Sequence, residues 1–400
     1  MHVHICGRMT FNPEEEAPLR TDESVANQDD ENHHKGETPL RKITEKLVSE
    51  FPLEPMHLVY LGVFRRFFLM IFETKRVTTL KSKFYKEQLS VYALSLKAYF
   101  PSELAAPRPI EDWRQFKAAE WRRLGLYDGF LIFEFLSSDP LVPSRRELKK
   151  LRILIACAIR IPSDQNLLSQ YRNEADILLR RFVLKSVSLF GQTFNVFNVH
   201  SLTHLIAETL LHGSLDNFSA WIYESYLGAI KYMLRKPGKT LEQIVCRLIE
   251  QRTLLSPEKC VSQETVLSQP HNSGPTFGLS DQFQKLSLPG MTFRVFSPCD
   301  TCFVTKSDEV FVLRNVVKSR EGIFLVCNAF LEKVDFFSSP LSSQLLGICR
   351  VKRLSGLKKY PVDVIKNKAV LLPLNKTGVI KEPSPHWMDE IECVCLSMLH

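Results

Sequence analysis

The repeating pattern of apolar residues changes once along this sequence, and that change limits the possible folds more than any other feature. From Thr44 to about residue 255, apolar residues recur at spacings of three and four, which is typical of amphipathic helices. From about residue 289, short β-type runs such as VFVLRNVV and GIFLVCNAF alternate with polar turns. We therefore expect an α+β protein, in which a mainly helical body precedes a small all-β domain.

The pattern predicts five segments. They are an acidic, loosely ordered arm (1–43), a helical domain (44–255), a linker rich in Ser, Pro, Gln and Gly (256–288), a small β barrel or sandwich (289–382) and a tail (383–400). Within the helical domain we expect helices over 111–124, 151–161, 171–190 and 241–252. One apolar stripe of this domain is formed by Leu58, Leu61, Phe64, Phe68 and Phe72.

Composition places the chain among ordinary intracellular proteins. It has 400 residues, of which 44% are hydrophobic and 24% are charged. The longest apolar stretch, 58–72, is too short for a membrane span and is interrupted by Arg65 and Arg66. The N-terminus is His-rich and then acidic, unlike a secretory signal. We expect a nuclear or cytoplasmic protein, neither secreted nor membrane-bound, with its ten cysteines reduced.

The net charge of +8 is unevenly distributed. Residues 1–44 carry nine acids and five Lys or Arg, which leaves 47 basic and 35 acidic residues in the rest of the chain. A basic body favours an anionic partner such as nucleic acid or an acidic protein, although many proteins of this charge never bind DNA.

The run from Phe197 to Arg235 contains the residues best suited to nucleic-acid chemistry. His200, His204 and Glu208 follow one another at intervals of four, which is one stripe of a helix. After a break, Glu224 opens a second helical pattern that carries Lys231 and Arg235. Two imidazoles one turn apart can bind one zinc ion, but such a pair is more often satisfied by hydrogen bonds.

Together with GRMTF, LRTDESV, HHKGETPL and FPLEPMHLVYLGV, this run resembles the C-terminal part of animal transposases of the CACTA-like (EnSpm-type) group. The resemblance implies a ribonuclease H-like fold with a helical insertion, and cleavage of DNA by two divalent metal ions held by two aspartates and one glutamate. Glu224 matches that glutamate. In the family both aspartates precede the stretch where this sequence begins, so Mg²⁺ binding is expected only if the full triad is present.

The resemblance also bears on two other motifs. In the family, a His pair such as His200 and His204 is completed by an upstream Cys-x-x-Cys, where this chain has only Cys6, beside His2 and His4. We therefore expect an incomplete zinc site. Glu54 and His57 lie where the family has Asp-x-x-His, and Glu54 could equally be a helix N-terminal acid.

The one Cys-x-x-Cys of the chain, at Cys299 and Cys302, falls in the predicted β domain. We interpret these residues as isolated reduced cysteines, because Cys327, Cys349, Cys393 and Cys395 do not complete a zinc site of the usual spacing. A weak zinc clip or a redox pair is the alternative.

Taken together, these residues predict a truncated, transposase-derived protein without catalytic activity. It would bind DNA weakly and non-specifically, or bind a protein. The expected contacts are Arg65, Arg66, Lys231, Arg235 and Lys236. One alternative is a DNA-cleaving transposase whose missing acids lie upstream, in a second copy or in a full-length relative. Another is a structural protein-interaction module.

Overall fold

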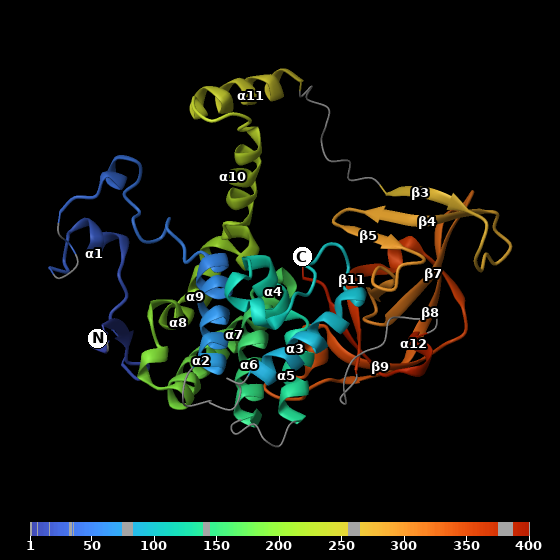
Figure 1. The fold of residues 1–400 in the computed structure, drawn as a ribbon, viewed down its shortest axis with the longest axis horizontal. Helices are drawn as coiled ribbons and strands as arrows, with labels where there is room; N and C mark the ends of the chain where they lie inside the picture. The colour runs from blue at the N-terminus through green and yellow to red at the C-terminus, as the bar shows by residue number, and fades with distance from the viewer. Residues whose placement is uncertain are drawn as a thin grey trace. The chain divides into compact units, whose positions relative to one another are not determined.

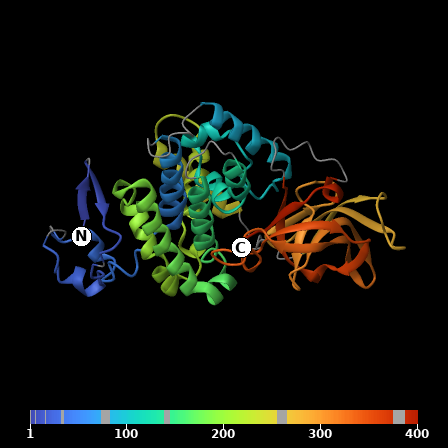
Figure 2. The same cartoon turned by 90° about the horizontal axis from the view of Figure 1, so that it is seen from below.

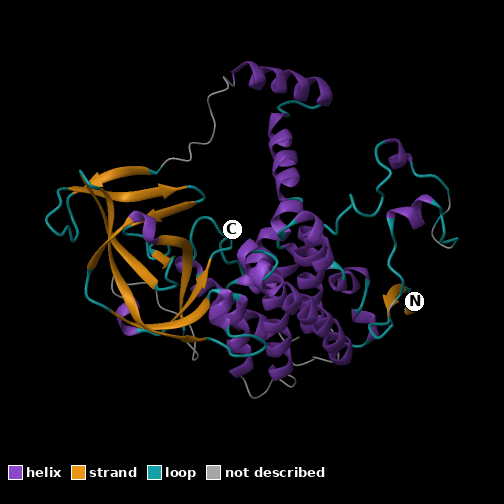
Figure 3. Cartoon of the chain, turned by 180° about the vertical axis from the view of Figure 1, so that it is seen from behind, coloured by secondary structure: helices purple, strands orange, loops and turns teal. Residues whose placement is uncertain are grey.

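The computed structural model describes residues 2–5, 7–15, 17–31, 34, 36–73, 83–138, 145–254, 265–374 and 387–399. Helices dominate the first two-thirds of the chain and antiparallel strands the last third (Figures 1 and 3), so the protein is α+β, as predicted. Across the described residues, we find no helix with the length and apolar character needed to cross a membrane.

The chain divides into two compact units, and the division does not follow the order of the sequence. The first unit comprises Met1–Phe218, Phe330–Leu354 and Ala369–His400, and the second comprises Ser219–Ala329 and Ser355–Lys368. The strands are therefore shared between the units, whereas the sequence pattern predicted a separate β domain over 289–382.

The first unit contains a helical body. Its helices are α1 Asp22–Ala26, the π-helix η2 Met56–Phe64, α2 Arg65–Glu73, α3 Lys83–Ser95, α4 Ala118–Leu126, α5 Gly129–Ser138, α6 Arg145–Arg160, α7 Gln165–Phe190, α8 Phe197–His200, α9 Leu205–His212 and α12 Trp387–Glu390. The helices predicted over 151–161 and 171–190 are confirmed as parts of α6 and α7.

The helix predicted over 111–124 is wrong as a single element. A 3-10 helix, η5 Ile110–Gln115, ends at Phe116, and α4 begins after Lys117. The side chain of Glu120 accepts a hydrogen bond from the backbone amide of Lys117 at 2.7 Å. This local cap starts a new helix, which the apolar spacing alone does not reveal.

Aromatic side chains fill the centre of the helical body, whose helices lie side by side (Figure 2). Phe67 contacts the rings of Phe133, Phe182 and Phe190, and Phe68 packs edge-on against Trp121. Gly62 lets α8 approach η2 closely, because a Cβ atom there would lie 2.2 Å from the side-chain nitrogen of Asn198. Of the predicted stripe, Leu58, Phe64, Phe68 and Phe72 are buried and Leu61 is partly buried.

The N-terminal arm is more structured than the sequence predicts. It begins with a hairpin of β1 His2–Ile5 and β2 Arg8–Phe11, and Phe11 exchanges backbone and side-chain hydrogen bonds with Asn195. Asp22 accepts hydrogen bonds from the backbone amides of Val48 and Ser49, at 2.6 and 3.0 Å. These contacts are distant in sequence, so composition alone indicated a loose arm.

Strands complete the first unit. They are the end of β8 Gly322–Asp335, β9 Ile348–Leu354, the end of β11 Ile365–Pro373 and β12 Cys393–Ser397. Strand β12 pairs with both β9 and β11, so part of the predicted tail is a central strand here. Its five residues are too few to show a period in sequence.

The strands of the first unit are joined to its helices by the fully buried Arg160 at the end of α6. Its guanidinium donates hydrogen bonds to the carbonyl oxygens of Leu126 and Leu346, at 3.2 and 2.7 Å, and to that of Ser397. The rings of Phe130 and Phe337 stack 5.7 Å apart in the same region. Helices and strands therefore share one core in this unit.

The second unit begins with two helices and continues with strands. They are α10 Trp221–Met233, α11 Thr240–Leu254, β3 Val266–His271, β4 Asp281–Leu288, β5 Met291–Arg294, β6 Cys302–Thr305, β7 Val310–Ser319, the start of β8, β10 Lys358–Pro361 and the start of β11. Helix α11 confirms the prediction over 241–252. The strand core includes Leu286, Phe293, Phe303, Phe311 and Leu325.

The linker predicted over 256–288 is wrong for its second half, because β3 and β4 lie there. Residues 255–264 and the predicted β-type run 378–381 lie outside the described residues. The strand Val266–His271 contains a proline and polar residues, which is tolerated because β3 pairs with β4 on one side only, at the end of the strand order.

Candidate functional site

The two histidines predicted as metal ligands lie next to each other in the first unit. The predicted continuous helix is instead α8, a 3-10 turn η7 Ser201–Thr203, and α9. Despite this break, the Nε2 atoms of His200 and His204 are 3.4 Å apart, and their rings meet edge-to-face. The structure thus places the two side chains where either a shared proton or a shared metal ion can join them.

The surroundings of this His pair favour neutral imidazoles. The ring of Phe11 stacks on that of His200 with 4.3 Å between centroids and 2° between planes. Burial, and then the neighbouring His204, lower the pKa of His200 to about 4. Burial, and then Arg180, lower the pKa of His204. Neutral imidazole is the form that binds metals.

The spacing of the His pair fits zinc. Two ligands at a Zn–N distance of about 2.0–2.1 Å, in tetrahedral geometry, lie roughly 3.4 Å apart. A structural zinc ion needs four ligands, and the described part of the chain holds no group of three or more His, Cys, Asp or Glu side chains arranged for a metal. Cys6 lies outside the described residues, while His2 and His4 stand opposite Phe11 and Met9 in the hairpin register.

Glu208, the third member of the predicted stripe, is paired elsewhere. Its carboxylate lies 3.9 Å from Nε2 of His212, one turn further along α9. Burial raises the pKa of Glu208. The 3-10 turn between α8 and α9 changes the helical phase, so sequence spacing was a poor guide to this position.

Glu54 caps the helix that begins at Met56. Its two carboxylate oxygens accept hydrogen bonds from the backbone amides of Met56 and His57, at 2.7 and 2.9 Å. The Nδ1 atom of His57 lies 2.6 Å from the same carboxylate. The structure therefore gives this motif the geometry of an N-terminal cap, the second of the two interpretations left open by the sequence.

Glu224 lies on the exposed side of α10, in the second unit, whereas His200 and His204 belong to the first. Lys231 lies two turns further along the same helix and is also exposed. Three large aromatic side chains of α10 are exposed as well: Tyr223 by 67%, Tyr226 by 52% and Tyr232 by 88%.

The predicted nucleic-acid contacts divide into two kinds. Arg65, Lys231, Arg235 and Lys236 are exposed. Arg66 instead donates hydrogen bonds to the carbonyl oxygens of Phe194, at 2.9 Å, and of Thr193. Its guanidinium also lies over the ring of Phe194, so Arg66 holds α2 against the segment before α8. Periodicity does not distinguish an anchoring arginine from an exposed one.

The turn between α10 and α11 is held in place by Gln243. Its side-chain oxygen accepts hydrogen bonds from the backbone amides of Arg235 and Lys236, at 3.0 and 3.2 Å. Its side-chain nitrogen donates to the carbonyl oxygens of Lys236 and Gly238. The backbone that carries the two cations is therefore fixed, while their side chains reach into solvent.

The cysteines of the strands are mostly buried. Cys302, Cys327, Cys349, Cys393 and Cys395 are buried and Cys299 is half-buried, all as free thiols. Cys349 and Cys395 face each other across β9 and β12. Burial raises the pKa of Cys299, so this cysteine of the Cys-x-x-Cys is not activated as a redox thiolate.

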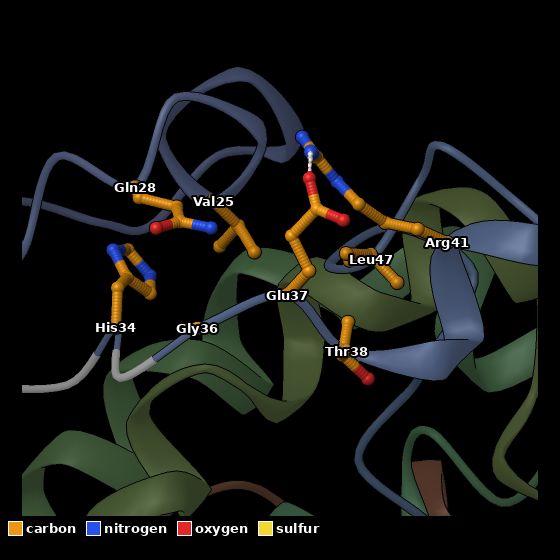
Figure 4. A pocket seen from close by; sticks show the side chains of 8 residues that line it. All are labelled: Val25, Gln28, His34, Gly36, Glu37, Thr38, Arg41 and Leu47. Atoms are coloured by element: carbon orange, nitrogen blue, oxygen red, sulfur yellow. Dashed lines mark ion pairs between the residues drawn. The ribbon is translucent and has the colours of Figure 1, made fainter.

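Sequence reasoning did not identify a cavity of about 240 Å³ in the N-terminal arm (Figure 4). Val25 and Leu47 form part of its wall, and His34 and the ion pair of exposed Glu37 with partly buried Arg41 form another part. The segments that meet there are separated by stretches of polar sequence. The sequence alone indicated only an acidic, loosely ordered arm in this region.

Comparisons with known proteins give one match, to a family model that covers part of the strand region. A family model described as a domain of unknown function, DUF8592, matches residues 270–384, which is less than a third of the chain. No match was found among curated proteins or among solved structures. The matched residues begin at the end of β3 and include strands β4 to β11.

Proposed function

We propose that this is a transposase-derived protein that does not cut DNA and that binds nucleic acid through α10 and the turn after it. The surface concerned consists of Tyr223, Tyr226, Lys231, Tyr232, Arg235 and Lys236, and we call it the α10 surface. Exposed cations and exposed aromatic rings together on this helix and the turn after it are the observation that carries the proposal.

The physical case rests on two kinds of contact. Lys and Arg side chains in solvent neutralise phosphates and release counterions. Aromatic rings offer faces on which unpaired bases stack without sequence preference. A helix that exposes three tyrosines and has Met233 as its only buried residue gains little from its own unit, so an external partner is its natural use.

We expect no DNA cleavage because the transposase resemblance assigns only one metal-binding acid, Glu224, to this chain. Two divalent ions about 4 Å apart require several carboxylates, and Glu224 is a single exposed acid. DNA binding without cleavage would place the protein in the nucleus.

Duplex DNA binding measured by fluorescence anisotropy across a range of salt tests the proposal. Reversing the charges with Lys231→Glu and Arg235→Glu should weaken binding at least tenfold and flatten the salt dependence, since each lost phosphate contact removes about 0.9 from the log–log slope. The matched control is Lys46→Glu with Lys97→Glu, which makes the same charge change at two exposed lysines of the first unit.

Two results would overturn the proposal. Equal loss in the control pair would mean that net charge, and not the α10 surface, drives binding. Cleavage of DNA with Mg²⁺ or Mn²⁺ that disappears in Glu224→Gln would show an active enzyme.

A further inference from the structure

A small cavity opens on the strands of the second unit, apart from every residue used above. Its volume is about 210 Å³, and Gln269, Gln284, Arg294, Phe296 and Ser297 line it. These residues come from β3, β4, the end of β5 and the turn that follows. Pockets for drug-sized ligands measure roughly 300–1,000 Å³, so this one suits a single planar group.

One wall of the cavity carries a fixed cation. The Nη1 atom of Arg294 donates to Asp300 at 2.6 Å, and the fully buried Lys368 donates to the other oxygen of the same carboxylate at 2.6 Å. Ser297 also donates to Asp300. The Arg294 side chain, which is 40% exposed, brings positive charge to the cavity wall, where it favours an anionic group.

A second wall carries an aromatic ring. Phe296 is 60% exposed, and its ring meets that of His271 edge-on at 5.3 Å. The Nε2 atom of His271 lies 3.1 Å from the side-chain oxygen of Asn315, which fixes the imidazole. The face of Phe296 is therefore held at the mouth of the cavity by a ring that is itself anchored.

The remaining lining groups are two amides. Gln269 and Gln284 are on adjacent strands, between the registered pairs Ser268–Lys285 and Pro270–Phe283. The structure gives neither side chain a hydrogen bond to another described residue. Each amide can donate and accept, as the edges of nucleobases require.

We propose that this cavity binds one nucleotide of single-stranded nucleic acid. The base stacks on Phe296, its edge forms hydrogen bonds with Gln269 and Gln284, and its phosphate lies beside Arg294. An acidic peptide would use the cation but would leave the aromatic face and the paired amides without a role. This site is independent of the α10 surface.

The test uses the full chain carrying Lys231→Glu and Arg235→Glu, so that loss of the α10 surface does not mask the cavity. Binding of dT12 is compared with binding of an abasic 12-mer of the same charge, by fluorescence anisotropy. Phe296→Ala should weaken dT12 binding at least fivefold and leave abasic binding unchanged. Gln284→Leu should weaken dT12 binding by a smaller factor.

Phe277→Ala is the matched control, since Phe277 is a second exposed phenylalanine of the same unit. Circular dichroism verifies that each variant is folded. An equal effect of the two phenylalanine substitutions, or equal affinity for the two strands, would overturn the proposal. Binding of a poly-glutamate peptide that exceeds binding of dT12 would do the same, in favour of a peptide partner.

Discussion

Helices α6 and α10 both have amphipathic sequences but lie in different surroundings. Both carry apolar residues at helical spacing together with cations. In α6, residues 151–160 are all buried, including Arg152 and Arg160. In α10, Met233 is the only buried residue. An amphipathic pattern therefore predicts that a helix forms, but not whether the partner for its apolar side lies within the same unit.

The cationic side chains of α6 and those of α10 and its following turn also differ in their surroundings. Arg152 donates to the carbonyl oxygen of Leu124 at 2.9 Å and lies over the ring of Phe130, 4.6 Å from its centroid. Arg160 joins the helices to the strands of the first unit. Lys231 and Arg235 instead extend into solvent. Arg152 and Arg160 therefore hold elements together, whereas Lys231 and Arg235 are accessible to a partner.

The largest expected effect is that of removing a buried cation. Arg160→Ala removes a donor from three carbonyl oxygens, in two buried hydrogen bonds and one partly buried one, and opens a cavity, so the free energy of unfolding should fall by roughly 3–5 kcal/mol. Urea unfolding monitored by circular dichroism measures this. Arg235→Ala, the exposed counterpart, should change it by less than about 0.5 kcal/mol. Similar losses in both variants would show that burial does not distinguish the structural roles of these two arginines.

The half-buried His200 should make the free energy of unfolding depend on pH, with an effect of intermediate size. The pKa of His200 is about 4 when folded and 6.5 when unfolded. Between these values the unfolded chain binds more protons, so stability is complete above pH 6.5 and falls as pH drops towards 4. We expect a loss on the order of 2 kcal/mol.

Urea unfolding at several pH values checks this prediction, and His200→Gln should flatten the profile in that window. Repeating the series with EDTA separates protonation from metal loss. If EDTA alone removes the pH dependence, and elemental analysis finds one zinc per chain, the His pair belongs to a complete zinc site, contrary to the incomplete one expected from the sequence.

The smallest effect should come from the exposed apolar side of α10. Tyr223→Ser and Leu227→Ser remove side chains that are 67% and 58% exposed, so each should change the free energy of unfolding by less than about 0.5 kcal/mol. Thermal unfolding measures the change. A loss above about 2 kcal/mol would show that this side of α10 is covered in solution. Helix α10 would then be buried as α6 is.

The candidate sites could be predicted only where local spacing survives folding. His200 and His204 remain adjacent although a 3-10 turn replaces the expected continuous helix, because only the three residues of that turn separate them. Glu208 was grouped with the His pair, but its partner in the folded chain is His212. Arg66 was grouped with the nucleic-acid contacts, but it donates to the carbonyl oxygen of Phe194. The cavity beside Phe296 was missed because β3 lay in a predicted linker.

By itself, the sequence determined the α+β class, the presence of α6, α7 and α11, and the β-type runs that became β5 to β8. These depend on periodicity, which neighbouring residues set. Only the tertiary structure decided that β9 and β12 share a core with the helices, and that Arg160 joins them. The hydrogen bond from Arg160 to Ser397 links residues 237 positions apart. The stability of such contacts comes from burial and from hydrogen bonds between distant segments, and no local pattern records them.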